Sequence, residues 1–355
     1  KKALEILQEN RDFFTRNYKK ETKLSILNDY LLGKNLWLTG KINDSIDVLE
    51  KAIKKAYHID TFLWGRGLIE LGYFYLMKGE IEKAKSYLNK GYEIFEKYIE
   101  LPESGLSRIY LAYLEGEKGN FKKAISLLKT SYQIFIKTRD FLSQAKVSSD
   151  IGLYYLQAEN WEEAKKWFKI SENLFDKINN PRGKTLARFN LGEVAIYEGK
   201  WDFAERVFEK SLNFDRATGN KWMIAYDLNS LGYIHFLKGN FEVAEKELKE
   251  SKNIFKKLEA FKEEADCWLK LAELYIEKRN YSLARKCLAN AFEIIRRESL
   301  TRLNVQLLLL EGLLYLNKKE NLEAEQVIEK CVEEAQKIGT RSLICLLYTS
   351  PSPRD

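Results

Sequence analysis

The sequence predicts an all-α fold, a right-handed α-solenoid of antiparallel helical hairpins, from three observations. Small side chains recur along the chain at a spacing of 39 and then 40 residues. Only Pro102 and Pro181 precede the C-terminal end, so long uninterrupted helices are expected. Helix formers such as Leu, Lys, Glu and Ala dominate a composition that is 45% apolar and 31% charged, which supplies ample material for a buried core.

Each repeat is defined by small side chains at fixed positions. The first set, which we call the midpoints, marks the middle of each expected first helix: Gly33, Gly72, Ala112, Gly152, Gly192, Gly232, Ala272 and Gly312. A second set follows twelve residues later: Ser45, Ala84, Ala124, Ala164, Ala204, Ala244, Ala284 and Ala324. A third set follows seven residues after the second: Ala52, Gly91, Ser131, Ser171, Ser211, Ser251, Ala291 and Cys331. A period of this length indicates one helical hairpin per repeat.

A large apolar residue stands four residues after the second set in every copy: Leu49, Leu88, Leu128, Phe168, Phe208, Leu248, Leu288 and Ile328. We expect these side chains to pack into the gaps left by the small residues of the facing helix. The turn between the two helices contains Gly79, Gly119, Gly199 and Gly239, at a position suited to left-handed φ.

Segments such as LGYFYLMKGEIEKAKSYLNKG, IGLYYLQAENWEEAKKWFKIS and LGYIHFLKGNFEVAEKELKES resemble tetratricopeptide repeats. The resemblance covers about residues 26–344, and it implies eight repeats that start near 26, 65, 105, 145, 185, 225, 265 and 305. The family period is about 34 residues, so each helix of a 40-residue repeat gains nearly one turn. This longer repeat is similar to those of kinesin light chains and of bacterial regulatory proteins.

Some repeats depart from the family pattern in the first helix, where the usual aromatic residue is replaced by Glu115, Ala195 and His235. The eighth repeat has Asn321 where other repeats start the second helix with an apolar or aromatic side chain. We expect His235 to be a packing substitute for tyrosine and the packing to be weakest near the third, fifth and eighth repeats.

Both ends of the sequence are expected to be artificial. Residues 1–20 have the pattern of the second helix of a truncated repeat. Residues 345–355, CLLYTSPSPRD, resemble the translation of a sequencing adapter, and the alternative is a native Ser/Pro-rich linker. The eight repeats are therefore expected to be an interior part of a longer array.

The residues that carry catalysis or bind cofactors are scarce. The chain has two histidines, and Cys267, Cys287 and Cys331 show no CxxC spacing, so they are expected to be small core residues in a reducing compartment. Phosphate-binding and hydrolase motifs are not found, and carboxylates alternate with lysines as on a solvated helix face. We expect no enzyme activity, no cofactor and no metal. An apolar run long enough to span a membrane is not found either.

A partner is expected to bind in the concave groove, which the first helices of a helical solenoid line. At about 100° per residue, the groove-facing positions are six and two residues before each midpoint and one and five after it. From the second repeat onward this selects Arg66, Glu70, Tyr73, Tyr110, Tyr113, Glu117, Lys146, Asp150, Gln157, Asn190, Glu193, Tyr197, Tyr226, Tyr233, Asp266, Lys270 and Glu273. Tyrosine is enriched among binding hot spots, although these residues could also be ordinary solvent-facing side chains.

The first hypothesis is a cytoplasmic scaffold for protein–protein interaction that holds a peptide or helix of its partner. The alternative is the sensor region of a larger signalling ATPase, kinase or transcription regulator. A third hypothesis, an RNA-binding solenoid, is weaker, because the net charge of +7 is dispersed and no polar pair recurs at one position to read bases.

Overall fold

The computed structural model describes residues 2–17, 22–98, 101–298 and 300–338. These ranges contain seventeen α-helices and no strand, which confirms the all-α prediction. The adapter-like residues 345–355 lie outside the described ranges. The chain divides into two compact units, residues 1–180 and 181–355, and each unit is described by itself.

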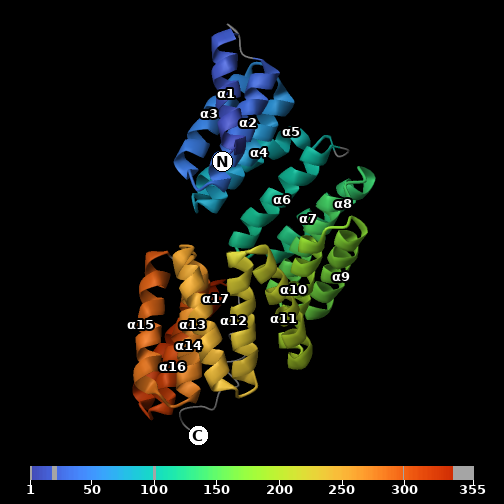
Figure 1. Ribbon diagram of the computed structural model, residues 1–355. Helices are drawn as coiled ribbons and strands as arrows, with labels where there is room; N and C mark the ends of the chain where they lie inside the picture. The colour runs from blue at the N-terminus through green and yellow to red at the C-terminus, as the bar shows by residue number, and fades with distance from the viewer. Residues whose placement is uncertain (1, 18–21, 99–100, 299, 339–355) are drawn as a thin grey trace. The chain divides into compact units, whose positions relative to one another are not determined.

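The first unit is a row of helices in which each helix packs against the next (Figure 1). Four hairpins, α2/α3, α4/α5, α6/α7 and α8/α9, follow a single helix α1. The bounds are α1 Lys2–Asn17, α2 Lys23–Leu38, α3 Ile42–Tyr57, α4 Thr61–Met77, α5 Ile81–Phe95, α6 Pro102–Glu117, α7 Phe121–Lys137, α8 Phe141–Gln157 and α9 Trp161–Lys177.

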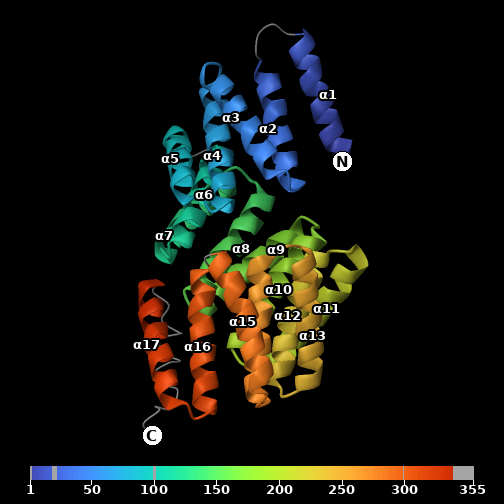
Figure 2. The same ribbon diagram turned by 90° about the vertical axis from the view of Figure 1, so that its left-hand side faces the viewer.

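The second unit repeats the same arrangement with four further hairpins (Figure 2). Their bounds are α10 Pro181–Tyr197, α11 Trp201–Thr218, α12 Lys221–Leu237, α13 Phe241–Lys257, α14 Phe261–Glu277, α15 Tyr281–Arg297, α16 Thr301–Asn317 and α17 Asn321–Ile338. The even-numbered helices from α2 to α16 are the first helices of the repeats, and the odd-numbered helices from α3 to α17 are the second helices.

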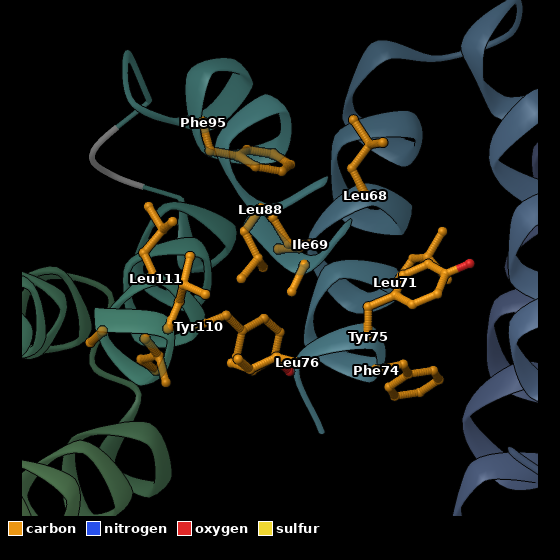
Figure 3. Close-up of a cluster of buried hydrophobic side chains, with 14 of the residues drawn as sticks. Leu68, Ile69, Leu71, Phe74, Tyr75, Leu76, Leu88, Phe95, Tyr110 and Leu111 are labelled. Atoms are coloured by element: carbon orange, nitrogen blue, oxygen red, sulfur yellow. The ribbon is translucent and has the colours of Figure 1, made fainter. Parts of the chain in front are cut away.

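The two helices of a hairpin meet where the sequence predicted. A Cβ added to Gly72 would lie 2.7 Å from Cγ of Leu88, and one added to Gly152 would lie 2.5 Å from Cε1 of Phe168. Each midpoint glycine meets the large residue sixteen positions later in this way. In Figure 3, Leu88 of α5 lies between Ile69 of α4 and Leu111 of α6 in one buried cluster. The glycines are therefore explained by close contact between helices.

The serines of the third small set join the two helices through hydrogen bonds. Ser131 donates to the carbonyl of Gly105 at 2.9 Å, Ser171 to that of Ala145 at 2.8 Å and Ser251 to that of Ala225 at 2.6 Å. Each acceptor lies 26 residues before its donor. A small hydroxyl side chain therefore satisfies a carbonyl inside the hairpin, which accounts for serine at this position.

The turns adopt the left-handed backbone that the glycines predicted, with φ of 82° at Gly79, 76° at Gly119, 72° at Gly199 and 79° at Gly239. Other residue types occupy the same turn elsewhere, at Glu159, Arg279 and Lys319 with φ of 61°, 56° and 62°. The turn geometry is therefore kept in these repeats without glycine, at a cost in backbone energy.

The family's tyrosine and its polar substitutes make polar contacts with the preceding repeat, with their own repeat or with both. Tyr275 donates to Glu245 Oε1 at 2.8 Å. His235, in the same position, has Nε2 3.8 Å from Glu205 Oε1 and 3.7 Å from Glu247 Oε2. Glu115 instead accepts hydrogen bonds within its own repeat from Asn120 and Lys123. The three cysteines at 267, 287 and 331 are buried and carry free thiols, as expected.

Candidate binding surface

The first helices form the inner side of each unit. Consecutive first helices approach one another in the pairs α2–α4 and α4–α6 of the first unit and α12–α14 and α14–α16 of the second. Within the described ranges, no two consecutive second helices approach to the same extent. A row of hairpins whose first helices are closer together is curved toward that side, so the first helices carry the inner face.

The predicted groove residues meet in pairs across neighbouring first helices. The residue after one midpoint contacts the residue two places before the next midpoint, a separation of 37 residues in 40-residue repeats. Tyr73 and Tyr110 stack with ring centroids 4.4 Å apart and planes 13° apart, and Tyr113 donates to Asp150 Oδ2 at 2.8 Å. We call these pairs rungs. They hold tyrosines and a carboxylate in fixed positions on the inner face of the first unit.

The same register produces rungs in the second unit. Ser230 donates to Glu193 Oε1 at 2.6 Å, and the Lys270 ammonium lies 5.3 Å from the ring centroid of Tyr233. Lys270 Nζ also forms an ion pair with Asp266 Oδ2 at 3.0 Å. In both units, therefore, predicted groove residues contact side chains that lie 37 residues away in the sequence.

Two further hydrogen bonds with this separation link α12 to α14. Tyr226 donates to Glu263 Oε1 and Asn229 donates to Asp266 Oδ2, both at 2.8 Å. We call the series of rungs in each unit a ladder. In the first unit, the rung nearest the N-terminus is an ion pair, with Lys34 Nζ 3.5 Å from Glu70 Oε1. Its separation is 36 residues, because the first repeat spacing is 39 residues.

Burial on the inner face shifts the pKa values of several predicted groove residues. Burial raises the pKa of Asp150 to about 7, although the Tyr113 hydroxyl and Lys146 act against this shift. Burial also raises the pKa of Glu273 to about 7. Burial disfavours the charged form of Lys270, but Asp266 and Glu193 outweigh that effect and hold the pKa of its ammonium above the usual value. The inner face of the second unit therefore carries a positive charge fixed between carboxylates.

The predicted residues differ in exposure. Glu70 and Tyr110 are buried, because their positions face the neighbouring first helix rather than solvent, and Asn190 is buried as well. Those that are exposed and lie beside the rungs are Arg66, Glu117, Lys146, Gln157 and Tyr197. Tyr197, the tyrosine in this set, is 58% exposed. The inner face thus combines fixed, half-buried side chains with a smaller set that solvent reaches freely.

Sequence reasoning missed a pocket on the inner face of the first unit. It has a volume of about 620 Å³ and is lined by α1, α2 and α4, with Leu49 of α3. In the first repeat, the groove-facing positions around Gly33 are Leu27, Leu31, Lys34 and Leu38, and the first three of these line the pocket. The side chains that α1 adds to the pocket could not be predicted from the spacing, because α1 has no midpoint residue from which to count.

Other kinds of site have no support in the described ranges. They contain no group of three or more His, Cys, Asp or Glu side chains placed to hold a metal ion. Among the same residues, no helix combines the length and apolar character needed to cross a membrane.

The family model for the tetratricopeptide repeat matches residues 66–98, 265–297 and 305–338. These segments fall within the second, seventh and eighth repeats, so the resemblance seen in the sequence is confirmed there. No curated protein matches the sequence significantly.

Solved structures share the helical array over most of the chain. A Rap protein complexed with competence and sporulation factor is 12% identical, with 92% of this chain and 96% of that chain covered and a TM-score of 0.67. NprR in complex with its cognate peptide NprX is 17% identical, with 88% and 90% covered and a TM-score of 0.65. Aspartyl phosphate phosphatase F from Bacillus subtilis is 15% identical, with 80% and 73% covered and a TM-score of 0.63. At these identities the likeness establishes the fold.

Proposed function

Because the chain carries tetratricopeptide repeats in a helical array of that type, we propose that it is a protein-interaction scaffold that binds a peptide or helix of its partner on the inner face of the first helices. The observation that carries this proposal is the ladder of rungs. Side chains that are already held in place lose little conformational entropy on binding, which favours affinity. Tyrosines with a fixed ring and a polar tip suit such a surface.

The residues proposed to contact the partner are the solvent-reached members of that face together with the half-buried rungs. Tyr197 and Tyr233 in the second unit and Tyr73 and Tyr113 in the first would offer ring surface. Lys146 would offer a charge that faces solvent. No cofactor, metal or catalytic group is part of this proposal.

A second candidate is a sensor region within a larger regulator. It is favoured by the likeness in fold to a Rap protein bound to competence and sporulation factor and to NprR bound to its cognate peptide NprX. What those proteins bind is a property of those proteins. For this chain, an ATPase, kinase or DNA-binding domain encoded next to the array in the genome would favour the sensor function, and a stop codon soon after residue 344 would favour a free-standing scaffold.

The test begins with selection of binding peptides from a random display library, with the full chain as bait. Titration calorimetry then measures the affinity of a selected peptide for Tyr197→Ala and Tyr233→Phe, with Tyr98→Ala as control because Tyr98 follows a second helix and is 47% exposed. We expect both inner-face variants to bind more weakly and the control to bind normally. Equal affinity for all four proteins would contradict the proposal.

RNA binding is the competing interaction. If the inner face bound RNA, affinity for a single-stranded oligonucleotide would fall steeply with salt. We expect no such binding at physiological salt, because carboxylates such as Glu193, Asp266 and Glu273 stand on the same face as the basic side chains.

A further inference from the structure

The pocket of the first unit differs from the rest of the inner face because it is mainly apolar. Its lining includes Phe13 of α1 and Leu24 and Leu31 of α2, whose side chains are 54%, 62% and 52% exposed. Phe74 of α4 and Leu49 of α3 form its buried floor. Three large apolar side chains that face solvent at one place indicate a binding surface.

The walls of the pocket are held together by hydrogen bonds and an ion pair. Asn28 of α2 donates to the carbonyl of Leu7 in α1 at 3.0 Å. Arg11 of α1 lies 3.2 Å from Asp29 of α2. Tyr30 of α2 donates to the carbonyl of Leu63 in α4 at 2.9 Å. These contacts join α1, α2 and α4, so the pocket is largely formed before a ligand arrives.

The charges at the rim are not balanced. Lys34 and Glu70 form the ion pair at 3.5 Å described above. Arg66 also lines the pocket and is exposed, and among the described residues no carboxylate lies within ion-pair distance of it. The unpaired guanidinium can form two parallel hydrogen bonds with a carboxylate, so the pocket is complementary to an apolar group that carries a negative charge.

We propose that this pocket is the anchoring subsite for a partner segment in which large apolar side chains stand beside a carboxylate, with the apolar side chains between α1, α2 and α4 and the carboxylate at Arg66. This inference rests on the proposed function and specifies the chemistry of the partner. The volume of about 620 Å³ lies within the range of roughly 300–1,000 Å³ found for ligand pockets. The lining residues of α2 extend from Leu24 to Lys34, about 15 Å along the helix, which matches four or five extended residues.

The test uses two dyes that share one ring system. Anilinonaphthalene sulfonate is apolar and anionic, and N-phenylnaphthylamine lacks the sulfonate. Fluorescence titration of the full chain with each dye is compared for Arg66→Met, Leu31→Asp and Arg206→Met. Arg206 is exposed on α11 and serves as the matched control. Arg66 and Leu31 are exposed, so the variants are expected to keep their helical circular dichroism.

We expect Arg66→Met to lower the affinity for the sulfonate dye about tenfold and to leave the affinity for the neutral dye unchanged. Leu31→Asp should weaken both dyes, and Arg206→Met neither. Unchanged binding of the sulfonate dye to Arg66→Met, or of both dyes to Leu31→Asp, would overturn the subsite. Dye binding to the pocket does not involve the rungs, so such a result would leave the proposed function standing. Conversely, a failed peptide selection would leave a positive dye result standing.

Discussion

Tyr113 of α6 donates a hydrogen bond of 2.8 Å to Asp150 of α8, across the boundary between two repeats. It is one rung of a ladder in which side chains 37 residues apart meet on the inner face. The bond joins Asp150, whose pKa is raised, to Tyr113, which is proposed to contact the partner, so it links the stability of the array to the proposed binding surface.

Removing the Tyr113 hydroxyl with Tyr113→Phe should raise the pKa of Asp150 above about 7, because that hydroxyl is the group that most favours the ionised form. An acid whose pKa is raised on folding contributes stability that is present below its unfolded value near 4 and is lost as pH rises through about 7. The variant should therefore lose about 1 kcal/mol more at pH 8 than at pH 4. Urea unfolding at both values measures the difference. A loss that is equal at the two pH values would contradict the assignment.

Asp215 and Asp227 predict a second pH dependence, in the junction between α11 and α12. Asp227 is 0% exposed. Asp215, also buried, stands where four other repeats have phenylalanine: Phe95, Phe135, Phe175 and Phe255. Burial raises the pKa of Asp227 to about 8; the Ser211 hydroxyl opposes this shift, and Asp215 and Glu193 add to it.

The unfolded chain loses the Asp227 proton near pH 4, while the folded chain keeps it to about pH 8. Stability should fall between these values by at most about 1.4 kcal/mol per pH unit, and Asp227→Asn should flatten that slope. Chemical unfolding from pH 4.5 to 8 measures the slope. The exposed Asp44→Asn is the control, and an identical slope in Asp227→Asn and the unmodified protein would refute the prediction.

Midpoint glycines face leucine, isoleucine or phenylalanine, whereas the two midpoint alanines, Ala112 and Ala272, face only leucine. Gly152 and Gly192 face Phe168 and Phe208, whereas Ala112 faces Leu128 at the corresponding position. Gly152→Ala should therefore destabilise the first unit by about 1–3 kcal/mol despite the better helix propensity of alanine. Adding Phe168→Leu should recover part of the loss, because it recreates the alanine–leucine pair. Thermal unfolding of the single and double variants tests this, and a stabilised Gly152→Ala would contradict it.

Substitution by glycine should stabilise the protein at turn positions where a residue other than glycine has left-handed φ. Arg279→Gly and Lys319→Gly are each expected to raise the free energy of unfolding by up to about 1 kcal/mol, because they remove the steric cost at φ of 56° and 62°. Lys278→Gly, one position earlier at a helical φ, is the control and should destabilise. Melting temperatures of the three variants decide the matter, and equal shifts in all three would exclude the backbone explanation.

The repeat could be predicted from the sequence because it depends on local spacing. The midpoints and the large residues that face them recur every 39 or 40 residues, as do the left-handed turns, which glycine occupies in several repeats; all three appear in the structure as predicted. The rungs could not be predicted, because a contact between Tyr73 and Tyr110 depends on how far one hairpin is shifted against the next. Helix periodicity selected both side chains as groove residues but could not show that they face each other.

The burial of Glu70 and Tyr110 has the same cause. An arc of about 100° on one helix is assigned to solvent by periodicity, yet part of that arc is covered when the neighbouring first helix is close. Asp215 was visible as a departure from the phenylalanine register, but only the structure places it beside a second buried carboxyl group. The pocket at Arg66 is lined in part by α1, and the repeat spacing does not predict where α1 packs.

The central claim is that a partner binds on the inner face of the first helices. Hydrogen exchange of the full chain with and without a selected peptide tests it most directly. We predict slower exchange in first helices such as α4, α6, α12 and α14, and unchanged exchange in α5, α7, α13 and α15. Protection confined to the second helices would contradict the account.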